Sequence, residues 1–140
     1  MSKQWNGKTC PACFQGTLEH RVKRTQFEYR SNILEYDQEG AWCGTCGEGI
    51  VTGKEAAAAE SLLDDFIARV DKEEASELAR IRKKLGLNQK EAAMIAGGGH
   101  NAFSRYERGE ARPVAAVVNL FRLLDRHPEL LNELKKQKAA

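Results

Sequence analysis

The sequence lacks any apolar run long enough to cross a membrane, because charged residues, 30% of the chain, interrupt every hydrophobic stretch. A membrane-spanning helix needs about 20 consecutive apolar residues. The segment Met1–Gly7 also contains no apolar stretch of signal-peptide length. Nothing in the sequence therefore predicts secretion, and we expect a cytoplasmic protein that does not bind a membrane.

Catalytic motifs are missing as well. The sequence shows no catalytic arrangement of paired carboxylates, no serine–histidine arrangement and no phosphate-binding glycine loop. Gly97-Gly98-Gly99 precedes a predicted helix, but neither the lysine nor the preceding strand of a nucleotide site accompanies it. We therefore expect a protein that is not an enzyme.

No charge of one sign dominates the chain, whose formal net charge is +2. The distribution is uneven, since residues 1–70 hold 8 Lys/Arg against 10 Asp/Glu, whereas residues 71–140 hold 14 against 10. A modest basic excess is weak support for nucleic-acid binding unless a motif accompanies it. If the chain binds nucleic acid, the C-terminal half is the expected place.

Cysteines are few, and all four fall in two identical spacings, Cys10-Pro11-Ala12-Cys13 and Cys43-Gly44-Thr45-Cys46. Two such pairs supply the four thiolates of a tetrahedral zinc ion, and the metal would stabilise a domain with few core residues. Disulfides, a redox-active pair and unrelated buried cysteines are the alternatives, of which a cytosolic setting disfavours the disulfides. We predict one structural Zn²⁺ bound by Cys10, Cys13, Cys43 and Cys46. His20 is expected on the surface because four thiolates already complete the metal's shell.

Between the cysteine pairs, apolar and polar residues alternate in patches, which predicts two or three antiparallel strands from Thr17 to Trp42. Basic residues interleave with aromatic ones there, as on a nucleic-acid face or, more commonly, on the solvated side of a hairpin. Helical periodicity starts at Thr52-Gly53-Lys54-Glu55, which has capping-box spacing. The charged run Asp71-Lys72-Glu73-Glu74 has no apolar periodicity and predicts a domain boundary near residue 71.

Residues 76–112 predict three short helices separated by glycines. Gly86 ends the first helix, and Asn88 and Glu91 have capping-box spacing at the start of the second. Ala96-Gly97-Gly98-Gly99 forms the next turn, and the third helix is expected over about residues 101–109. Two short helices joined by a glycine turn are typical of a helix-turn-helix.

The third predicted helix has an apolar side with Phe103 and Tyr106. Its opposite, polar side is formed by Asn101, Ser104, Arg105 and Arg108. Asparagine presents a donor and an acceptor that match adenine, arginine presents a fork that matches guanine, and the N-terminal end of such a helix enters the major groove. Asn101 and Arg105 are therefore the leading candidates for base contacts; an N-cap and a solvated surface charge are the alternative interpretations of these two residues.

The residues Arg82-Lys83-Lys84-Leu85-Gly86-Leu87-Asn88-Gln89-Lys90-Glu91-Ala92-Ala93, followed by Ser104-Arg105-Tyr106-Glu107-Arg108-Gly109, resemble the Xre/Cro family of helix-turn-helix repressors. A narrower resemblance comes from two further segments, the run from Gly97 to Glu107 and the ending His127-Pro128-Glu129-Leu130-Leu131. Together with the two cysteine pairs, they resemble the MqsA-type antitoxins, which join a YgiT-type zinc-finger domain to an Xre/Cro-type helix-turn-helix. The resemblance covers the chain from Cys10 to about Leu134.

The resemblance implies a function for each part of the chain. In that family the zinc domain binds a small ribonuclease toxin of the MqsR type, and the C-terminal domain represses the operon by binding operator DNA. By position, Asn101 and Arg105 would contact bases, and Asn88 and Gln89 would contact phosphate. The predicted DNA-binding set is completed by Lys90, His100, Ser104 and Arg108. Arg82 and Glu107 would form a buried ion pair that orients the third helix.

The segment Val114–Asp125 is unusually apolar, and at about 100° per residue its apolar side chains cover an arc of roughly 220°. Packing against one core needs a narrower arc. Either the same domain covers both sides, with help from a following helix at residues 128–136, or a second copy of the chain covers one of them. We favour a homodimer, because operators read by this motif usually have two half-sites.

The predicted fold is α+β with two domains. Residues 1–70 form a small zinc-binding domain with four cysteine ligands, a short antiparallel β-sheet and a helix, and residues 71–140 form an all-α, Xre/Cro-like helix-turn-helix domain for DNA binding and dimerisation. The favoured function is an antitoxin of a type II toxin–antitoxin system that also represses transcription. The alternative is a stand-alone zinc-containing regulator that senses metal or redox state.

Overall fold

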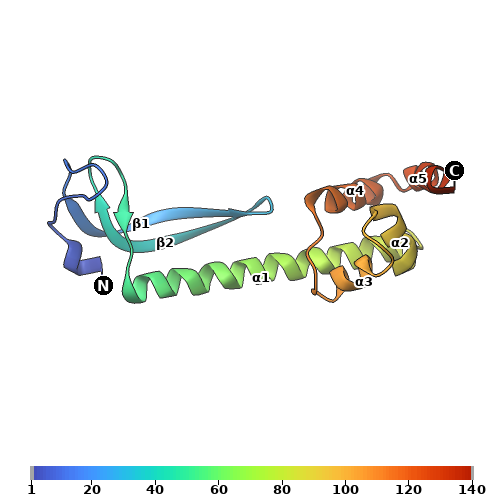
Figure 1. The fold of residues 1–140 in the computed structure, drawn as a ribbon, viewed down its shortest axis with the longest axis horizontal. Coiled ribbons are helices and arrows are strands. Elements are labelled where there is room, and N and C mark those ends of the chain that lie inside the picture. The colour runs from blue at the N-terminus through green and yellow to red at the C-terminus, as the bar shows by residue number, and fades with distance from the viewer. Residues whose placement is uncertain (1, 140) are drawn as a thin grey trace. The chain divides into compact units, whose positions relative to one another are not determined.

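The computed structural model describes residues 2–139, and the chain divides into two compact units, residues 1–68 and 69–140. The fold is α+β, as predicted (Figure 1). In chain order the elements are the 3₁₀ turn η1 (Ser2–Trp5), the strands β1 (Leu18–Tyr29), β2 (Asn32–Cys43) and β3 (Gly49–Ile50), and the helices α1 (Gly53–Lys84), α2 (Gln89–Ala96), α3 (Ala102–Glu107), α4 (Ala115–Arg126), η2 (Pro128–Leu130) and α5 (Leu131–Ala139).

A long β-hairpin dominates the first unit. β1 and β2 pair antiparallel along their whole length, from Leu18 opposite Cys43 to Tyr29 opposite Asn32, and β3 adds to the end of β2. The hairpin turn consists of Arg30 and Ser31, whose φ angles of 49° and 64° are those that a two-residue type I′ turn requires. The predicted antiparallel strands between the cysteine pairs are confirmed.

The core of the first unit is small and is built around the cysteines. Its buried residues are Cys10, Leu18, Ala41 and Cys43, with Trp5, Cys13 and Ile50 packed against them. Further along the hairpin, Phe27 of β1 meets Phe66 of α1 edge to face, with ring centroids 6.1 Å apart. Since so little apolar surface is buried, a metal held by the cysteines would add a large share of this unit's stability.

The two units divide between residues 68 and 69, close to the predicted boundary near residue 71, but α1 does not end at the charged run Asp71-Lys72-Glu73-Glu74. It continues through this run to Lys84. Lysine and glutamate are good helix formers, and no glycine or proline interrupts the segment. Val70, Glu74 and Leu78 are buried at intervals of four, so one side of the helix stays covered across the run.

The predicted capping box at Thr52 is wrong. Thr52 Oγ1 is buried and has no hydrogen-bond partner in the described part of the chain. Ser2 occupies the position instead: its hydroxyl accepts a hydrogen bond from the Thr52 N–H at 3.4 Å, and its own N–H and hydroxyl both donate to Glu55 Oε2. Thr52 and Glu55, which would have formed the box with each other, are therefore linked through a residue about 50 positions earlier, which local spacing does not reveal.

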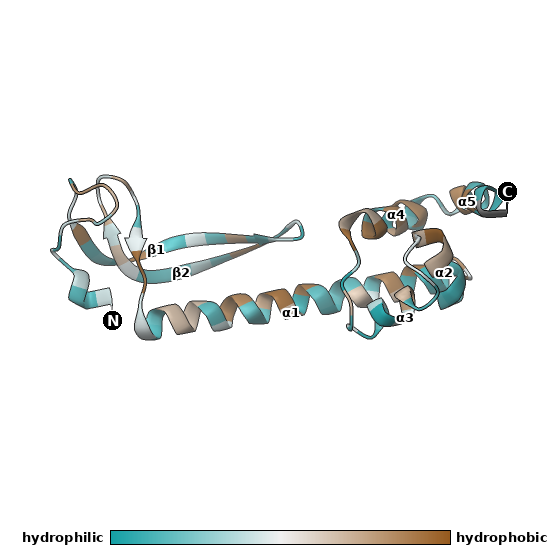
Figure 2. Cartoon of the chain, viewed as in Figure 1, coloured by the Kyte–Doolittle hydropathy of each residue, from teal (hydrophilic) through white to brown (hydrophobic). Residues whose placement is uncertain are grey.

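The second unit packs helices around a continuous apolar core. Phe103 of α3 and Phe121 of α4 lie at its centre, fully buried, with ring centroids 4.7 Å apart. Figure 2 shows hydrophobic residues recurring along α1 and α4. Ion pairs join these two helices as well, because Arg80 and Lys84 both contact Asp125 at 2.9 Å and hold the pKa of its carboxyl down at about 2. None of the described helices is long and apolar enough to cross a membrane.

Candidate functional site

The four cysteines come from two turns at one end of the β-hairpin. Cys10 and Cys13 lie in the loop before β1, whereas Cys43 is the last residue of β2 and Cys46 follows in the next turn. Antiparallel pairing places Leu18, just after the first turn, opposite Cys43. The sheet register therefore brings together two cysteine pairs that are 29 residues apart in the sequence.

The sulfur geometry fits a tetrahedral metal. All four thiols are free, and their Sγ atoms lie within 4.8 Å of one another. The Sγ atoms of Cys10 and Cys46 are 3.7 Å apart, and those of Cys13 and Cys43 are 3.8 Å apart. A tetrahedral Zn²⁺ with Zn–S bonds of about 2.3 Å separates its sulfurs by about 3.8 Å. The predicted cysteines thus form a metal site, and four thiolates leave it no open position for a catalytic water.

Backbone amides stabilise thiolates in both turns. The N–H groups of Ala12, Gly16 and Thr45 donate to the sulfurs of Cys10, Cys13 and Cys43 at 3.3–3.4 Å. Backbone hydrogen bonds of this kind lower the pKa of the Cys43 thiol to about 6 and also lower the pKa of Cys13. Cys46 differs: although the Glu48 amide favours its thiolate, burial and the neighbouring thiols raise its pKa to about 12. A bound cation would stabilise all four thiolates at once, so the pKa of Cys46 would no longer be raised by its neighbours.

Gly16 is a requirement of the site that the sequence analysis missed. A Cβ atom at this position would overlap Cys43 Sγ and would stand 2.8 Å from Thr45 Oγ1. Cys43 and Thr45 are held by the sheet and the second cysteine turn, so neither gives way cheaply. The only signal in the sequence was a glycine three residues after Cys13.

We expect Gly16→Ala to weaken metal binding, because the added methyl group displaces a ligand sulfur. Overpacking of this kind costs about 1–3 kcal/mol, or about tenfold or more in metal affinity. Competition with a coloured chelator measures the change. Gly44→Ala is the matched control, since a Cβ at Gly44 would meet no described atom within 4 Å. Equal metal affinity in the two variants would contradict the steric role of Gly16.

The second candidate site is the helix-turn-helix formed by α2, the turn over residues 97–101, and α3. Asn88 caps α2 as predicted: its side chain accepts from the Glu91 N–H at 2.8 Å, and the Glu91 carboxylate accepts from the Asn88 N–H. Gly97 has the left-handed φ of 83° that ends α2. α3 is shorter than predicted and runs from Ala102 to Glu107. Phe103 is fully buried and Tyr106 is partly buried, so both face inward as predicted.

A buried polar network holds α3 in place. Arg82 lies 2.9 Å from Glu107 Oε1, and these two side chains are 13% and 9% exposed. Arg82 also donates to the Leu87 carbonyl at 2.8 Å, and the Gln89 amide donates to the other oxygen of Glu107. The network therefore ties the ends of α1 and α3 to the start of α2. The link from Gln89 was not foreseen, since this residue was predicted to contact phosphate.

The outer side of α3 presents polar groups to solvent. Asn101 and Arg105 are exposed; the Asn101 side chain makes no capping bond within the described chain, and Arg105 forms no ion pair there. Both line a shallow depression together with His100, Tyr106 and Arg112.

The other predicted DNA-binding residues differ in their exposure and in their partners. Lys90 is exposed, Ser104 is half-buried, and the Asn88 side chain is used in the cap. Arg108 is exposed but pairs with Glu110 at 2.9 Å.

Three comparisons bear on these sites. A family profile described as the antitoxin component of a bacterial toxin-antitoxin system, MqsA, matches residues 8–135, a range that includes both the cysteines and the helix-turn-helix. Antitoxin MqsA of Escherichia coli (strain K12) is 41% identical over 130 residues, which are 90% of this chain and 98% of that protein. A solved structure of the N-terminal domain of the E. coli protein MqsA is similar over 44% of this chain and 94% of its own, with 27% identity and a TM-score of 0.42.

Proposed function

The chain belongs to the MqsA family, the antitoxin components of bacterial toxin-antitoxin systems, and from this premise we propose that its two units bind two different partners. Residues 1–68 bind the toxin, and residues 69–140 bind operator DNA and repress transcription. As an MqsA-type antitoxin the chain is not an enzyme, in agreement with the sequence analysis. The stand-alone regulator considered there gives way to an antitoxin.

The metal of the cysteine centre is one structural Zn²⁺ in this proposal. Four thiolates whose sulfurs lie within 4.8 Å of one another, two pairs of them at 3.7 and 3.8 Å, suit a d¹⁰ ion without geometric preference. The backbone amides that donate to the sulfurs favour the charged thiolates such an ion needs. The ion's function is to keep the small first unit folded so that its hairpin can bind the toxin.

DNA recognition is assigned to the exposed side of α3. Asn101 stands at the N-terminal end of α3 and Arg105 in its middle. Neither side chain forms a hydrogen bond or ion pair with the described residues, so DNA binding would not have to break one. This is the observation that carries the DNA-binding half of the proposal. Asn101 contacts adenine and Arg105 contacts guanine, whereas the exposed side chains of Lys90, His100 and Arg108 contact the DNA backbone, with Ser104 beside them. The side chains of Asn88 and Gln89 are already bonded within the unit, so their predicted phosphate contacts would have to come from the backbone at the start of α2.

Dimerisation is assigned to the part of α4 that the second unit leaves uncovered. Val117, Val118, Phe121 and Leu124 are buried in the core of the unit. Val114 and Leu123 are 64% and 41% exposed although both are apolar. A second copy packed on the side of Leu123, which faces away from the buried residues of α4, would give the two-fold symmetry that two operator half-sites require.

The toxin in this proposal is a small ribonuclease of the MqsR type encoded by the neighbouring reading frame. Co-expression of the full chain with that reading frame tests the proposal: the antitoxin should relieve growth arrest and co-purify with the toxin, and the same preparation should shift DNA from its own upstream region. Failure to bind the toxin while DNA binding persists would contradict the first half. The reverse result would contradict the second half.

A further inference from the structure

Three side chains that commonly bind metals meet on the first unit, outside the cysteine centre. They are His20 of β1, Glu39 of β2 and Glu55 in the first turn of α1. His20 lies opposite Ala41 in the sheet register, so Glu39, two residues away from Ala41, shares its face of the hairpin. One ligand atom from each of the three side chains lies within 4.8 Å of the others.

His20 is not the surface residue that the sequence analysis expected. Its side chain is 19% exposed, and the Nε2 atom itself is fully enclosed. This atom lies 3.0 Å from Glu39 Oε1, yet no hydrogen bond of acceptable geometry links it to any group in the described chain. An enclosed ring nitrogen without a hydrogen bond needs another partner, because burying it unsatisfied is unfavourable.

Glu55 is held in position by a neighbour of its own. The N–H and the hydroxyl of Ser2 both donate to Glu55 Oε2, at 3.3 Å and 3.2 Å. Desolvation pushes the pKa of Glu55 upward, but these hydrogen bonds outweigh it and the net pKa is lowered, so the carboxylate is charged. Outer partners that fix a carboxylate in this way are typical of metal ligands.

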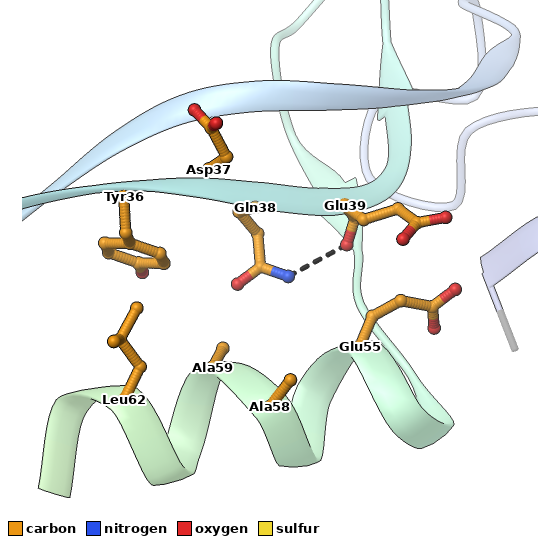
Figure 3. A pocket seen from close by; sticks show the side chains of 8 residues that line it. All are labelled: Tyr36, Asp37, Gln38, Glu39, Glu55, Ala58, Ala59 and Leu62. Atoms are coloured by element: carbon orange, nitrogen blue, oxygen red, sulfur yellow. Dashed lines mark hydrogen bonds between the residues drawn. The ribbon is translucent and has the colours of Figure 1, made fainter. Parts of the chain in front are cut away.

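A pocket adjoins the two carboxylates. Glu39 and Glu55 line one end of it, and Figure 3 shows their carboxylates directed to the same side, away from Tyr36 and Leu62. The pocket holds about 180 Å³, which is room for several water molecules. Water that reaches the carboxylates through this space could complete the coordination shell of an ion.

We propose that His20, Glu39 and Glu55 form a second metal site, separate from the cysteine centre, that binds a divalent cation of the Zn²⁺ and Co²⁺ class. One imidazole and two carboxylates suit such an ion better than Ca²⁺ or Mg²⁺, which prefer oxygen ligands alone. The ion would satisfy the enclosed Nε2 atom and neutralise two carboxylates. It would also link β1, β2 and the start of α1, and so stabilise a unit with a small core.

The test uses the full chain with its cysteine centre already loaded with one equivalent of Zn²⁺. Titration with further Zn²⁺ by calorimetry should show one additional site, and Co²⁺ should shift the imidazole resonances of His20 in NMR spectra. The chain has three histidines. His127, which lies 3.6 Å from the single carboxylate of Glu129, is the control within the molecule and should shift much less.

Glu39→Gln and His20→Gln should each weaken the additional site about tenfold or more, since each removes one ligand. Glu35→Gln is the matched control: it removes the same charge from the same strand, at an exposed position that pairs with Arg24 at 3.5 Å, and should leave binding unchanged. Unaltered tryptophan fluorescence would show that the variants remain folded.

Two results would overturn the second site. One is the absence of an additional equivalent in the unmodified chain up to ~1 mM Zn²⁺, a concentration at which binding would be too weak to be specific. The other is equal binding by the Glu39→Gln and Glu35→Gln variants. Either would mean that His20 and Glu39 contact each other without sharing a metal ion.

Discussion

Replacement of Cys43 by serine is expected to release the metal and unfold the first unit, while the second unit stays folded. Metal binding by four thiolates contributes folding free energy on the order of 10 kcal/mol. The first unit has little else to replace it, because its buried core consists largely of the cysteines and their immediate neighbours. The second unit has its own core around Phe103 and Phe121, which does not depend on the metal.

Spectroscopy separates the two units cleanly. Both tryptophans, Trp5 and Trp42, belong to the first unit, so fluorescence reports on that unit alone. Far-UV circular dichroism reports mainly on the helices, including those of the second unit. A chelator added to the unmodified chain should reproduce the fluorescence change of Cys43→Ser and should not affect the variant further. Protein purified without chelator that contains no zinc would contradict this prediction, as would a single melting transition for both units.

The cysteine centre and the start of α2 were predictable because short-range chemistry dictates them. A tetrahedral ion imposes the spacing of Cys10 and Cys13 and repeats it at Cys43 and Cys46. The cap of α2 needs a side-chain acceptor and a carboxylate three residues later, and Asn88 and Glu91 supply them. The cap joins groups three residues apart, and each cysteine pair is itself local, so the sequence displays both patterns directly; only the meeting of the two cysteine pairs depends on the register of the sheet.

The course of α1 was not predictable from periodicity, because its two halves pack against different cores. Leu63 and Phe66 belong to the first unit, whereas Leu78 and Ile81 are buried in the second. Between them, the covered side of the helix is marked by a buried acid, Glu74. A charged residue at a core-facing position conceals the apolar stripe, although nothing in the backbone requires the helix to stop.

The partners of polar side chains were missed where they come from distant parts of the chain. Ser2 binds Glu55, and Gln89 binds Glu107. Gln89 illustrates the consequence: its predicted position at the start of the second helix was correct, but its amide already belongs to the network that holds α3. A variant at Gln89 would therefore disturb the helix-turn-helix itself. Lys90, exposed on the same helix, is the better residue for testing phosphate contact.

Replacement of Arg105 by alanine is expected to weaken operator binding about ten- to a hundredfold and to bring it close to the affinity for unrelated DNA. A bidentate contact between arginine and guanine is worth about 1–3 kcal/mol of discrimination against another base. Arg105 is exposed and forms no ion pair among the described residues, so its removal breaks no salt bridge within the unit. The loss should therefore reflect DNA recognition rather than folding, and toxin binding should be unchanged.

Two control variants separate base reading from charge. Lys90→Ala should weaken binding to operator and scrambled duplex by similar factors and reduce the salt dependence, because a phosphate contact carries no sequence information. Arg126→Ala removes the same charge as Arg105→Ala from the exposed end of α4 and should have little effect on either duplex. Fluorescence anisotropy with both duplexes at two salt concentrations measures all three variants. If Arg105→Ala kept the full ratio of operator to scrambled affinity, Arg105 would contact the backbone, and Asn101 with the shape of the DNA would have to account for specificity.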